Sequence, residues 1–423
     1  MEESLAVSAI RKKLVGKTLS YKEIYAIMDE IAHKRLGDVL TTYFAASGYS
    51  KGFSNEELYY LTKAMVETGE QLHFRGIVAD KHSIGGISGT RTTMILVPIV
   101  AAAGFTIPKS SSRAITTPGG TADDMEVLAP VIFDKEHIYK IIEKTNGCIV
   151  WGGSFNIAPA DDIIIKVEAP LLFESFDKVL VSIMAKKVAF GSNHVVIDLP
   201  YGKLVKVHNL TDAEILAKKF EYLAGKFNLT LKVLMHETDQ PAGRGIGPLL
   251  EAKEALRVLE RHAHRPIDLE NRALNLAGAL LDLCLHDSSN QLQEKIKKEF
   301  GDGKAWATSI LAAGKAHEKM LEIIKAQNGD PNINSDSLHP GNYRHEILSA
   351  HSGTVREINV PNTTIIAKIL GAPAQKRAGI YLDKKIGEKV GRHDILCTLY
   401  SDSKENLKEA SDTLRNFSLF KIE

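Results

Sequence analysis

The feature that most constrains the fold is a change in sequence texture near Gly76. Before it, apolar residues recur at helical spacing, and Ser-x-x-Glu capping boxes at Ser20 and Ser54 open two helical segments. After it, short apolar runs such as CIVW and HVVIDL alternate with glycine turns and helical stretches. Strands that alternate with helices form mainly parallel sheets. The sequence therefore predicts a small all-helical domain followed by a large α/β domain with a mixed, mostly parallel sheet.

A polar segment marks a further boundary between residues 328 and 346. It is NGDPNINSDSLHPGNYRHE, and its many Asn, Asp, Pro and Gly residues are typical of a linker. Beyond it, runs such as SGTVREINV and GEKVGRHDILCTLYS are followed by a last helical stretch. We expect a small C-terminal β-rich domain that carries a helix.

Charge and apolar content exclude several classes of partner. The 53 Lys and Arg residues balance 52 Asp and Glu residues, so we expect no nucleic-acid and no membrane partner. The longest nearly apolar run, Met94 to Ile107, contains a proline and is shorter than the roughly 20 residues that span a bilayer, so it predicts a buried helix. The N-terminal residues have no signal-peptide pattern, and the three cysteines (Cys148, Cys284 and Cys397) are far apart. Both features favour a cytoplasmic protein.

Two loops rich in glycine and hydroxyl residues precede helical stretches. The first is DKHSIGGISGTRTT, residues 80–93, and the second is KSSSRAITTPGGTADDMEVL, residues 109–128. A helix N-terminus offers unpaired amides and a positive dipole end, so each loop is typical of an anion site, although either alone is also typical of a strand-ending turn. Neither is a Walker loop or a GxGxxG dinucleotide motif. A third glycine-rich run, GRGIG at 243–247, lacks nearby hydroxyls and is interpreted as a strand-to-helix turn.

Several motifs in order along the chain resemble the pyrimidine nucleoside phosphorylase family, which includes thymidine phosphorylase. They are DKHSIGG, SSSRAIT, PGGTADDMEVL, APADD and SIMAKK, and they resemble most closely the branch shared with archaeal AMP phosphorylases. The resemblance implies a helical domain of residues 1–70 with 161–190. It implies an α/β phosphate-binding domain of 71–160 with 191–330, and a barrel-sandwich-like β-rich domain of 345–423. It also implies a homodimer.

The resemblance further implies the site and its chemistry. Family members cleave a nucleoside with inorganic phosphate as co-substrate, and we expect neither a metal nor another cofactor. His82 would donate a proton to the base, with Glu174 as an alternative donor. Ser182 and Lys186, four apart on one helix face, would bind the base, and Lys206 the nucleoside. The implied phosphate-binding residues are Lys81, Ser83, Gly86, Thr93, Ser111, Ser112, Arg113, Thr117 and Thr121.

The identity of the base is left open. Thymidine enzymes have an arginine upstream of the SIMAKK-type serine, and this sequence has IIIKVEAPLL there, without arginine. That difference favours a nucleoside 5′-monophosphate such as AMP, cleaved to ribose 1,5-bisphosphate. AMP phosphorylases also carry a domain before the helical one, whereas this sequence begins with the helices, which favours a pyrimidine nucleoside. Our main expectation is thymidine, which would give 2-deoxyribose 1-phosphate.

Other classes of protein are also compatible with parts of the pattern. Anthranilate phosphoribosyltransferase has a related fold, but it needs magnesium and lacks the β-rich end domain. A phosphate-binding or assembly protein without catalysis would retain the loops, yet the intact Lys81, His82 and Ser83 favour an enzyme. Lys384 and Lys385 do not lie in the sequence context of a lipoyl-bearing lysine, so we do not expect a carrier function.

Overall fold

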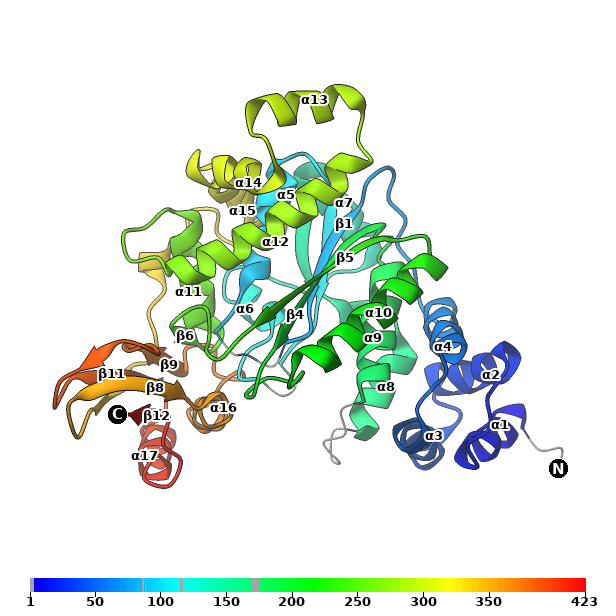
Figure 1. Cartoon of the computed structure of the whole chain (residues 1–423), viewed down its shortest axis with the longest axis horizontal. Helices are drawn as coiled ribbons and strands as arrows, with labels where there is room; N and C mark the ends of the chain where they lie inside the picture. The colour runs from blue at the N-terminus through cyan, green and yellow to red at the C-terminus, as the bar shows by residue number, and fades with distance from the viewer. Residues whose placement is uncertain (1–3, 86, 88, 115–116, 169–174) are drawn as a thin grey trace.

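The computed structural model describes the chain except residues 1–3, 86, 88, 115–116 and 169–174 (Figure 1). A helical part lies at one end of the molecule and a β-rich part at the other, with an α/β part between them. Among the described residues, no helix is both long and apolar enough to cross a membrane.

The helical part combines N-terminal helices with two helices from the middle of the chain. Ser20 and Ser54 form the predicted capping boxes, each accepting a bond from the backbone of a glutamate three residues on. The apolar faces that these boxes introduce are buried together, and α8 and α9 pack against them. The bounds are α1 Leu5–Leu14, α2 Tyr21–Ala32, α3 Gly37–Lys51, α4 Asn55–Glu67, α8 Pro159–Glu168 and α9 Phe176–Ala189.

The α/β part is built on parallel strands. Strand β4 pairs in parallel with β1 and with β5, and β2 pairs in parallel with β3. A parallel bridge between Val78 and Thr106 joins the two groups of strands. The strands are β1 Ala79–Ser83, β2 Ile107–Ser111, β3 Gly147–Trp151, β4 His194–Tyr201 and β5 Thr230–Glu237. The helices are α5 Thr92–Ala102, α6 Thr121–Met125, α7 Lys135–Thr145, α10 Leu210–Lys226, α11 Pro248–Leu259, α12 Ile267–His286, α13 Asn290–Glu299, α14 Gly303–Ala312 and α15 Lys315–Ala326.

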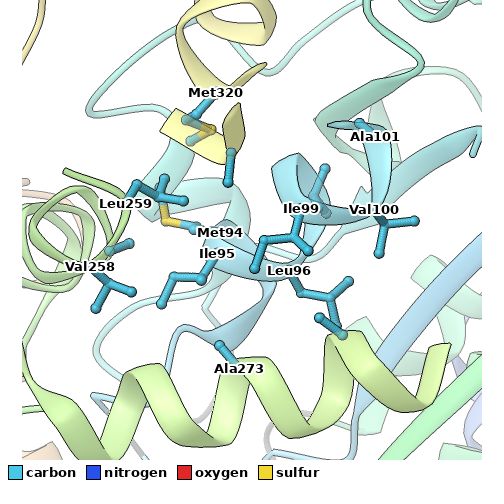
Figure 2. Packing of buried hydrophobic residues seen from close by; sticks show 14 of the residues in the cluster. Met94, Ile95, Leu96, Ile99, Val100, Ala101, Val258, Leu259, Ala273 and Met320 are labelled. Carbon is cyan, nitrogen blue, oxygen red and sulfur yellow. The ribbon is translucent and has the colours of Figure 1, made fainter. Parts of the chain in front are cut away.

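Side-chain alternation along β4 separates two cores. Val195 and Ile197 belong to the core shared with α9 and α10, whereas Val196 belongs to the core that contains α5 and α12. The predicted buried helix is α5, which packs on α11, α12 and α15 (Figure 2). A strand residue therefore faces either the helical part or the α5 and α12 layer, and this choice decides where the polar residues at the strand ends point.

The C-terminal part is β-rich, as predicted, and its strands pair antiparallel. One sheet has the order β10-β8-β12 and the other β6-β9-β11-β7. Strand β6 comes from the GRGIG run and is followed directly by α11, so that run is the predicted strand-to-helix turn and also joins the C-terminal sheet. The bounds are β6 Gly245–Ile246, β7 Tyr343–Leu348, β8 Gly353–Ile358, α16 Val360–Ile369, β9 Gly379–Leu382, β10 Lys389–Val390, β11 Ile395–Ser401, α17 Lys404–Thr413 and β12 Phe420–Ile422. The predicted fold class is confirmed.

Candidate active site

A cavity of about 620 Å³ is lined by residues of the α/β part and of α8 and α9. The loops that follow β1 and β2 form its α/β wall, and the other wall is helical. Gly86 and Glu174 lie outside the described residues. The cavity brings together the other predicted residues, which are Lys81, His82, Ser83, Thr93, Ser111, Ser112, Arg113, Thr117, Thr121, Ser182, Lys186 and Lys206.

One face of β1 presents Lys81 and Ser83 toward the α5 and α12 layer. The Lys81 ammonium donates to Ser83 and to the Thr92 hydroxyl at 2.9 Å, and it lies 3.7 Å from a carboxylate oxygen of Asp198. The hydroxyl of Thr93 also accepts from Lys81, at 3.4 Å. Burial lowers the pKa of Lys81 to about 8, because the nearby Asp198 only partly offsets the loss of water. The amine is thus a buried cation surrounded by hydroxyls, an arrangement suited to an anion.

The opposite face of β1 presents Asp80 and His82. Asp80 is buried, forms an ion pair with Lys187, accepts from Ser192 at 3.1 Å and lies 3.7 Å from the Lys109 amine. Burial, and then the charge of Lys187, lowers the pKa of Lys109 to about 7. Burial and the same lysines lower the pKa of His82 well below its ordinary value. His82 is therefore a neutral imidazole at pH 7, surrounded by more cations than anions.

The second loop is organised around Asp123 on α6. One oxygen of Asp123 accepts from the backbone of Ala114 at 2.7 Å and of Gly120 at 3.1 Å. The Arg113 guanidinium, 3.2 Å from the other Asp123 oxygen, also binds both oxygens of Glu126. These bonds fold the loop back on the first turn of α6. Ser111, Ser112, Thr117 and Thr121 then lie on the cavity wall.

The helical wall carries the predicted base-binding pair. Ser182 and Lys186 are one turn apart on α9, and the Lys186 amine donates to the Ser182 hydroxyl at 3.3 Å. Both contact Asp161 at the start of α8, Ser182 at 2.8 Å and Lys186 at 2.7 Å. Burial opposes the charge of Lys186, but Asp161 outweighs it and raises the pKa of the amine. The wall thus presents a hydroxyl and a cation whose positions are set by one carboxylate.

A second cationic centre lies beyond Asp198. The guanidinium of Arg272 on α12 is 3.5 Å from the Asp198 oxygen that faces away from Lys81, and it contacts His236 at the end of β5. Its Nε is buried and has no hydrogen-bond partner among the described residues. Lys206 and Arg272 both line the cavity. Asp198 therefore lies between two basic groups, Lys81 and Arg272.

Sequence reasoning assigned no role to several residues of this cavity. Lys109 and Lys187 lie within quoted motifs, but nothing in the motifs indicates that both approach Asp80. Asp198 lies within β4, opposite the last residue of β1, and a carboxylate near the carboxyl end of a parallel strand pair is a signal that could have been used. Arg272 lies in an ordinary amphipathic helix, and no sequence pattern marks it.

Comparison with known proteins identifies the family. A region described as the helical bundle domain of a glycosyl transferase family matches residues 7–69, and the a/b domain of that family matches residues 75–316. The C-terminal domain of pyrimidine nucleoside phosphorylases matches residues 354–420. The chain belongs to the nucleoside phosphorylase family. The three matched domains follow one another along the chain.

Two similar curated proteins are AMP phosphorylases, from Methanococcus vannielii and Methanocaldococcus jannaschii. The protein from Methanococcus vannielii is 44% identical over 415 residues, which cover 98% of this chain and 80% of that protein. The protein from Methanocaldococcus jannaschii is 42% identical over 422 residues, covering 100% of this chain and 82% of that protein. Anthranilate phosphoribosyltransferase from Thermus thermophilus has a TM-score of 0.61, with 18% identity over 76% of this chain and 99% of that one. That last likeness concerns the fold alone.

The cavity of this nucleoside phosphorylase family member is built around lysine, arginine and hydroxyl groups. Within the described parts of the chain, no group of three or more His, Cys, Asp or Glu side chains is arranged to hold a metal ion. Three carboxylates of the cavity have cationic partners: Asp161 pairs with Lys186, Glu168 with Lys178, and Asp198 with Lys81 and Arg272. The chemistry of the wall is therefore that of anion binding.

Proposed function

We propose that this protein is a nucleoside 5′-monophosphate phosphorylase that converts an AMP-type nucleotide and inorganic phosphate to a free base and ribose 1,5-bisphosphate. This substrate class replaces thymidine, our main expectation from sequence. The observation that carries it is the second cationic centre at Arg272, in the same cavity as Lys81 and separated from it by Asp198. A thymidine enzyme needs one anion site, whereas a nucleotide enzyme needs two. The names of the similar proteins support the same substrate class.

In the proposed reaction, one phosphate lies against Lys81, Ser83 and the hydroxyls of the second loop. An oxygen of that phosphate forms a bond to the anomeric carbon of the ribose as the bond from this carbon to the base nitrogen breaks. The electron pair of the broken bond leaves with the base, which takes up a proton. Charge develops on the sugar and the base between two prepared sites, so the residues act chiefly by positioning and by electrostatics.

The proton that reaches the base has two proposed sources. His82 faces the lysine-rich side of β1, and its lowered pKa leaves the imidazole without an acidic proton to donate at pH 7. A bound phosphate dianion offsets the charges of Lys109 and Lys187 and raises the pKa of the imidazole toward its usual value. His82 can then donate as a general acid. Glu174 remains the other proposed donor.

The substrate proposal is tested by phosphorolysis assays with AMP, adenosine, CMP and thymidine, for the wild type and for Arg272→Met. The wild type should cleave AMP with the highest kcat/KM. Losing a charge-assisted bond of roughly 1.5 to 3 kcal/mol should lower kcat/KM for AMP about 10- to 100-fold in the variant. Its activity on adenosine, which has no 5′-phosphate, should change little. Faster cleavage of thymidine than of AMP by the wild type would sink the proposal.

We also propose that the reaction needs no metal, since Lys81, Lys109 and Lys187 supply the positive charge that magnesium supplies in phosphoribosyl transfer. Activity should survive EDTA. A loss of activity that magnesium restores would favour the anthranilate-type transferase instead.

A homodimer is part of the proposal as well. Four exposed apolar side chains lie in the helical part, where the resemblance implies the subunit contact. They are Leu14 and Val15 at the end of α1, and Val39 and Tyr43 on α3. Light scattering after size exclusion should give twice the mass of the chain, and Val39→Asp should shift it toward the monomer. A monomeric wild type would contradict this part.

A further inference from the structure

The C-terminal part contacts the groups behind the two anion loops through two lysines, one for each loop. Lys385 lies between β9 and β10, and Lys376 lies between α16 and β9. Neither residue lines the cavity. The amine of each lysine nevertheless contacts the groups that bind one of the two anion loops.

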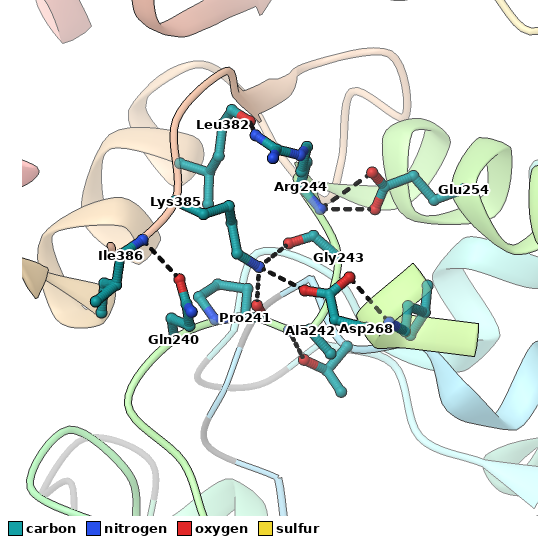
Figure 3. A network of polar contacts seen from close by, with 12 residues as sticks. Gln240, Pro241, Ala242, Gly243, Arg244, Glu254, Asp268, Leu382, Lys385 and Ile386 are labelled. Carbon is teal, nitrogen blue, oxygen red and sulfur yellow. Dashed lines mark hydrogen bonds and ion pairs between the residues drawn. The ribbon is translucent and has the colours of Figure 1, made fainter. Parts of the chain in front are cut away.

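Lys385 is inserted into the turn that precedes β6 (Figure 3). Its amine donates to the backbone carbonyls of Pro241 and Gly243, the latter at 2.9 Å, and to Asp268 at 3.0 Å. The side chain is only 6% exposed, and burial lowers its pKa. The adjacent Ile386 amide donates to the Gln240 side chain at 3.0 Å. A buried lysine with three acceptors holds this turn in one position.

The same turn supports the first anion loop. The amide of Gly243 donates to the carbonyl of Gly89 at 3.0 Å, and the amide of Ala242 donates to the Thr90 hydroxyl at 3.0 Å. Thr90 lines the cavity. The backbones of Gly243 and Gly89 are packed too closely for a side chain, because a Cβ on Gly243 would lie 2.8 Å from the carbonyl oxygen of Gly89. Lys385 thus acts on the loop through one intervening layer of backbone.

Lys376 supports the second anion loop through Asp123. Its amine is 2.9 Å from Asp123 and 2.9 Å from Glu126. Asp123 is the carboxylate that binds the amides of Ala114 and Gly120, and Glu126 is the partner of Arg113. Burial raises the pKa of Asp123, but the bond from Lys376 is the largest of the contacts that outweigh it and lower the pKa. Lys376 therefore keeps this carboxylate charged and in place.

We propose that Lys376 and Lys385 are positioning residues for inorganic phosphate, through which the C-terminal domain preorganises both halves of the phosphate site. A site made of backbone amides and hydroxyls binds a dianion well only when its donors converge without first having to be ordered. Without Lys385, buried carbonyls of the turn lose their donor. Without Lys376, Arg113 is left as the one cation among the described residues that pairs with both Asp123 and Glu126, and the second loop loosens.

The proposal rests on the proposed phosphate site, so its test begins with inorganic phosphate alone and does not depend on the nucleotide. The full-length variants Lys376→Met, Lys385→Met and Lys384→Met are titrated with phosphate by calorimetry, and KM is then measured separately for phosphate and for AMP. Lys384, next to Lys385, is the matched control, because it pairs with Asp394 on the side away from the turn. Lys376→Arg is the rescue variant, since a guanidinium can bind Asp123 and Glu126 together.

Lys376→Met and Lys385→Met should each weaken phosphate binding about tenfold and leave the KM for AMP unchanged. Lys384→Met should bind phosphate like the wild type, and Lys376→Arg should recover most of the affinity. Circular dichroism identifies a variant that fails to fold. If Lys385→Met fails to fold, the comparison of Lys376→Met with Lys376→Arg provides the decisive measurement, because Lys376 is partly exposed.

The outcomes that overturn the proposal are distinguishable. If the wild type binds phosphate and a folded Lys376→Met binds it equally well, the positioning role is wrong while the proposed function stands. If the wild type binds no phosphate at all, the proposed phosphate site is wrong and this inference fails with it. Equal increases in both KM values would indicate general loosening of the structure and would also overturn the specific role.

Discussion

The pKa values of the lysines are shifted in opposite directions on the two walls of the cavity. On the α/β wall, burial lowers the pKa of Lys81 to about 8 and of Lys109 to about 7. On the helical wall, the pKa of Lys186 is raised, because Asp161 and Asp162 outweigh its burial. One wall has an excess of buried positive charge and the other is neutralised by its own carboxylates. A bound anion would offset this excess, which supports the proposal that phosphate binds at the α/β wall.

The walls also differ in how they are held. The α/β loops are tied through backbone amides, as Asp123 does for Ala114 and Gly120. On the helical wall, Ser182 and Lys186 are linked through a side chain, because both contact Asp161. Backbone ties fix the direction of several donors at once, whereas side-chain ties leave rotamers that can adjust to a ligand. We expect phosphate recognition to be rigid and base recognition to be adaptable.

The largest effect is expected from removing the central cation of the α/β wall. Lys81→Met should cost about 3 kcal/mol of transition-state stabilisation, as the loss of other prepared oxyanion donors does. The loss should appear in kcat/KM for phosphate in steady-state kinetics. Lys140→Met on the exposed side of α7 is the control and should be as active as the wild type. Wild-type kinetics in Lys81→Met would contradict the assignment of phosphate binding to the α/β wall.

A pH profile should separate the two walls next. Lys81 is charged below a pKa of about 8 and loses its proton above it, whereas the raised pKa of Lys186 keeps that lysine charged throughout. Between about pH 7.5 and 9.5, the charged fraction of a group with this pKa falls about twentyfold. The kcat/KM for phosphate should fall by a similar factor, and KM for the nucleotide should stay level. Parallel changes in both parameters would mean that the walls share one titrating group.

A smaller effect is expected from the carboxylate of the helical wall. Asp161→Asn keeps the shape of the side chain but removes the charge that Lys186 pairs with, so the amine and Ser182 should lose their fixed positions. Losing one such contact should cost about 1 kcal/mol of binding free energy and raise KM for the nucleotide roughly fivefold. Calorimetry with inorganic phosphate should detect no change. Weaker phosphate binding in this variant would contradict the independence of the walls.

The same division explains what could be predicted from the sequence. Much of the α/β wall comes from the loops after β1 and β2. Each loop is continuous in sequence, so its glycines, hydroxyls and lysine before a helix indicated an anion site without any knowledge of the fold. Asp198 and Arg272 come from β4 and α12, and their approach to Lys81 depends on parallel strand pairing rather than on any motif. The contact of Asp80 with Lys187 joins residues 107 positions apart, beyond the reach of any periodicity. The parallel strands and the C-terminal domain were predictable from alternation, but not the passage of β6 into the C-terminal sheet.

The smallest effect concerns the stability of the support behind the α/β wall. Burial raises the pKa of Glu254 to about 7, although its carboxylate accepts from the Arg244 amide. The folded state therefore binds a proton between pH 4.5 and 7 that the unfolded chain has lost, so the free energy of unfolding decreases as pH rises through this range. Glu254→Gln removes this titration and should stabilise the protein at about pH 8, with little change at about pH 5. Denaturant unfolding at both pH values measures the difference. Equal stability changes at the two pH values would show that Glu254 acts by packing, and the support of the phosphate loop would then be independent of pH.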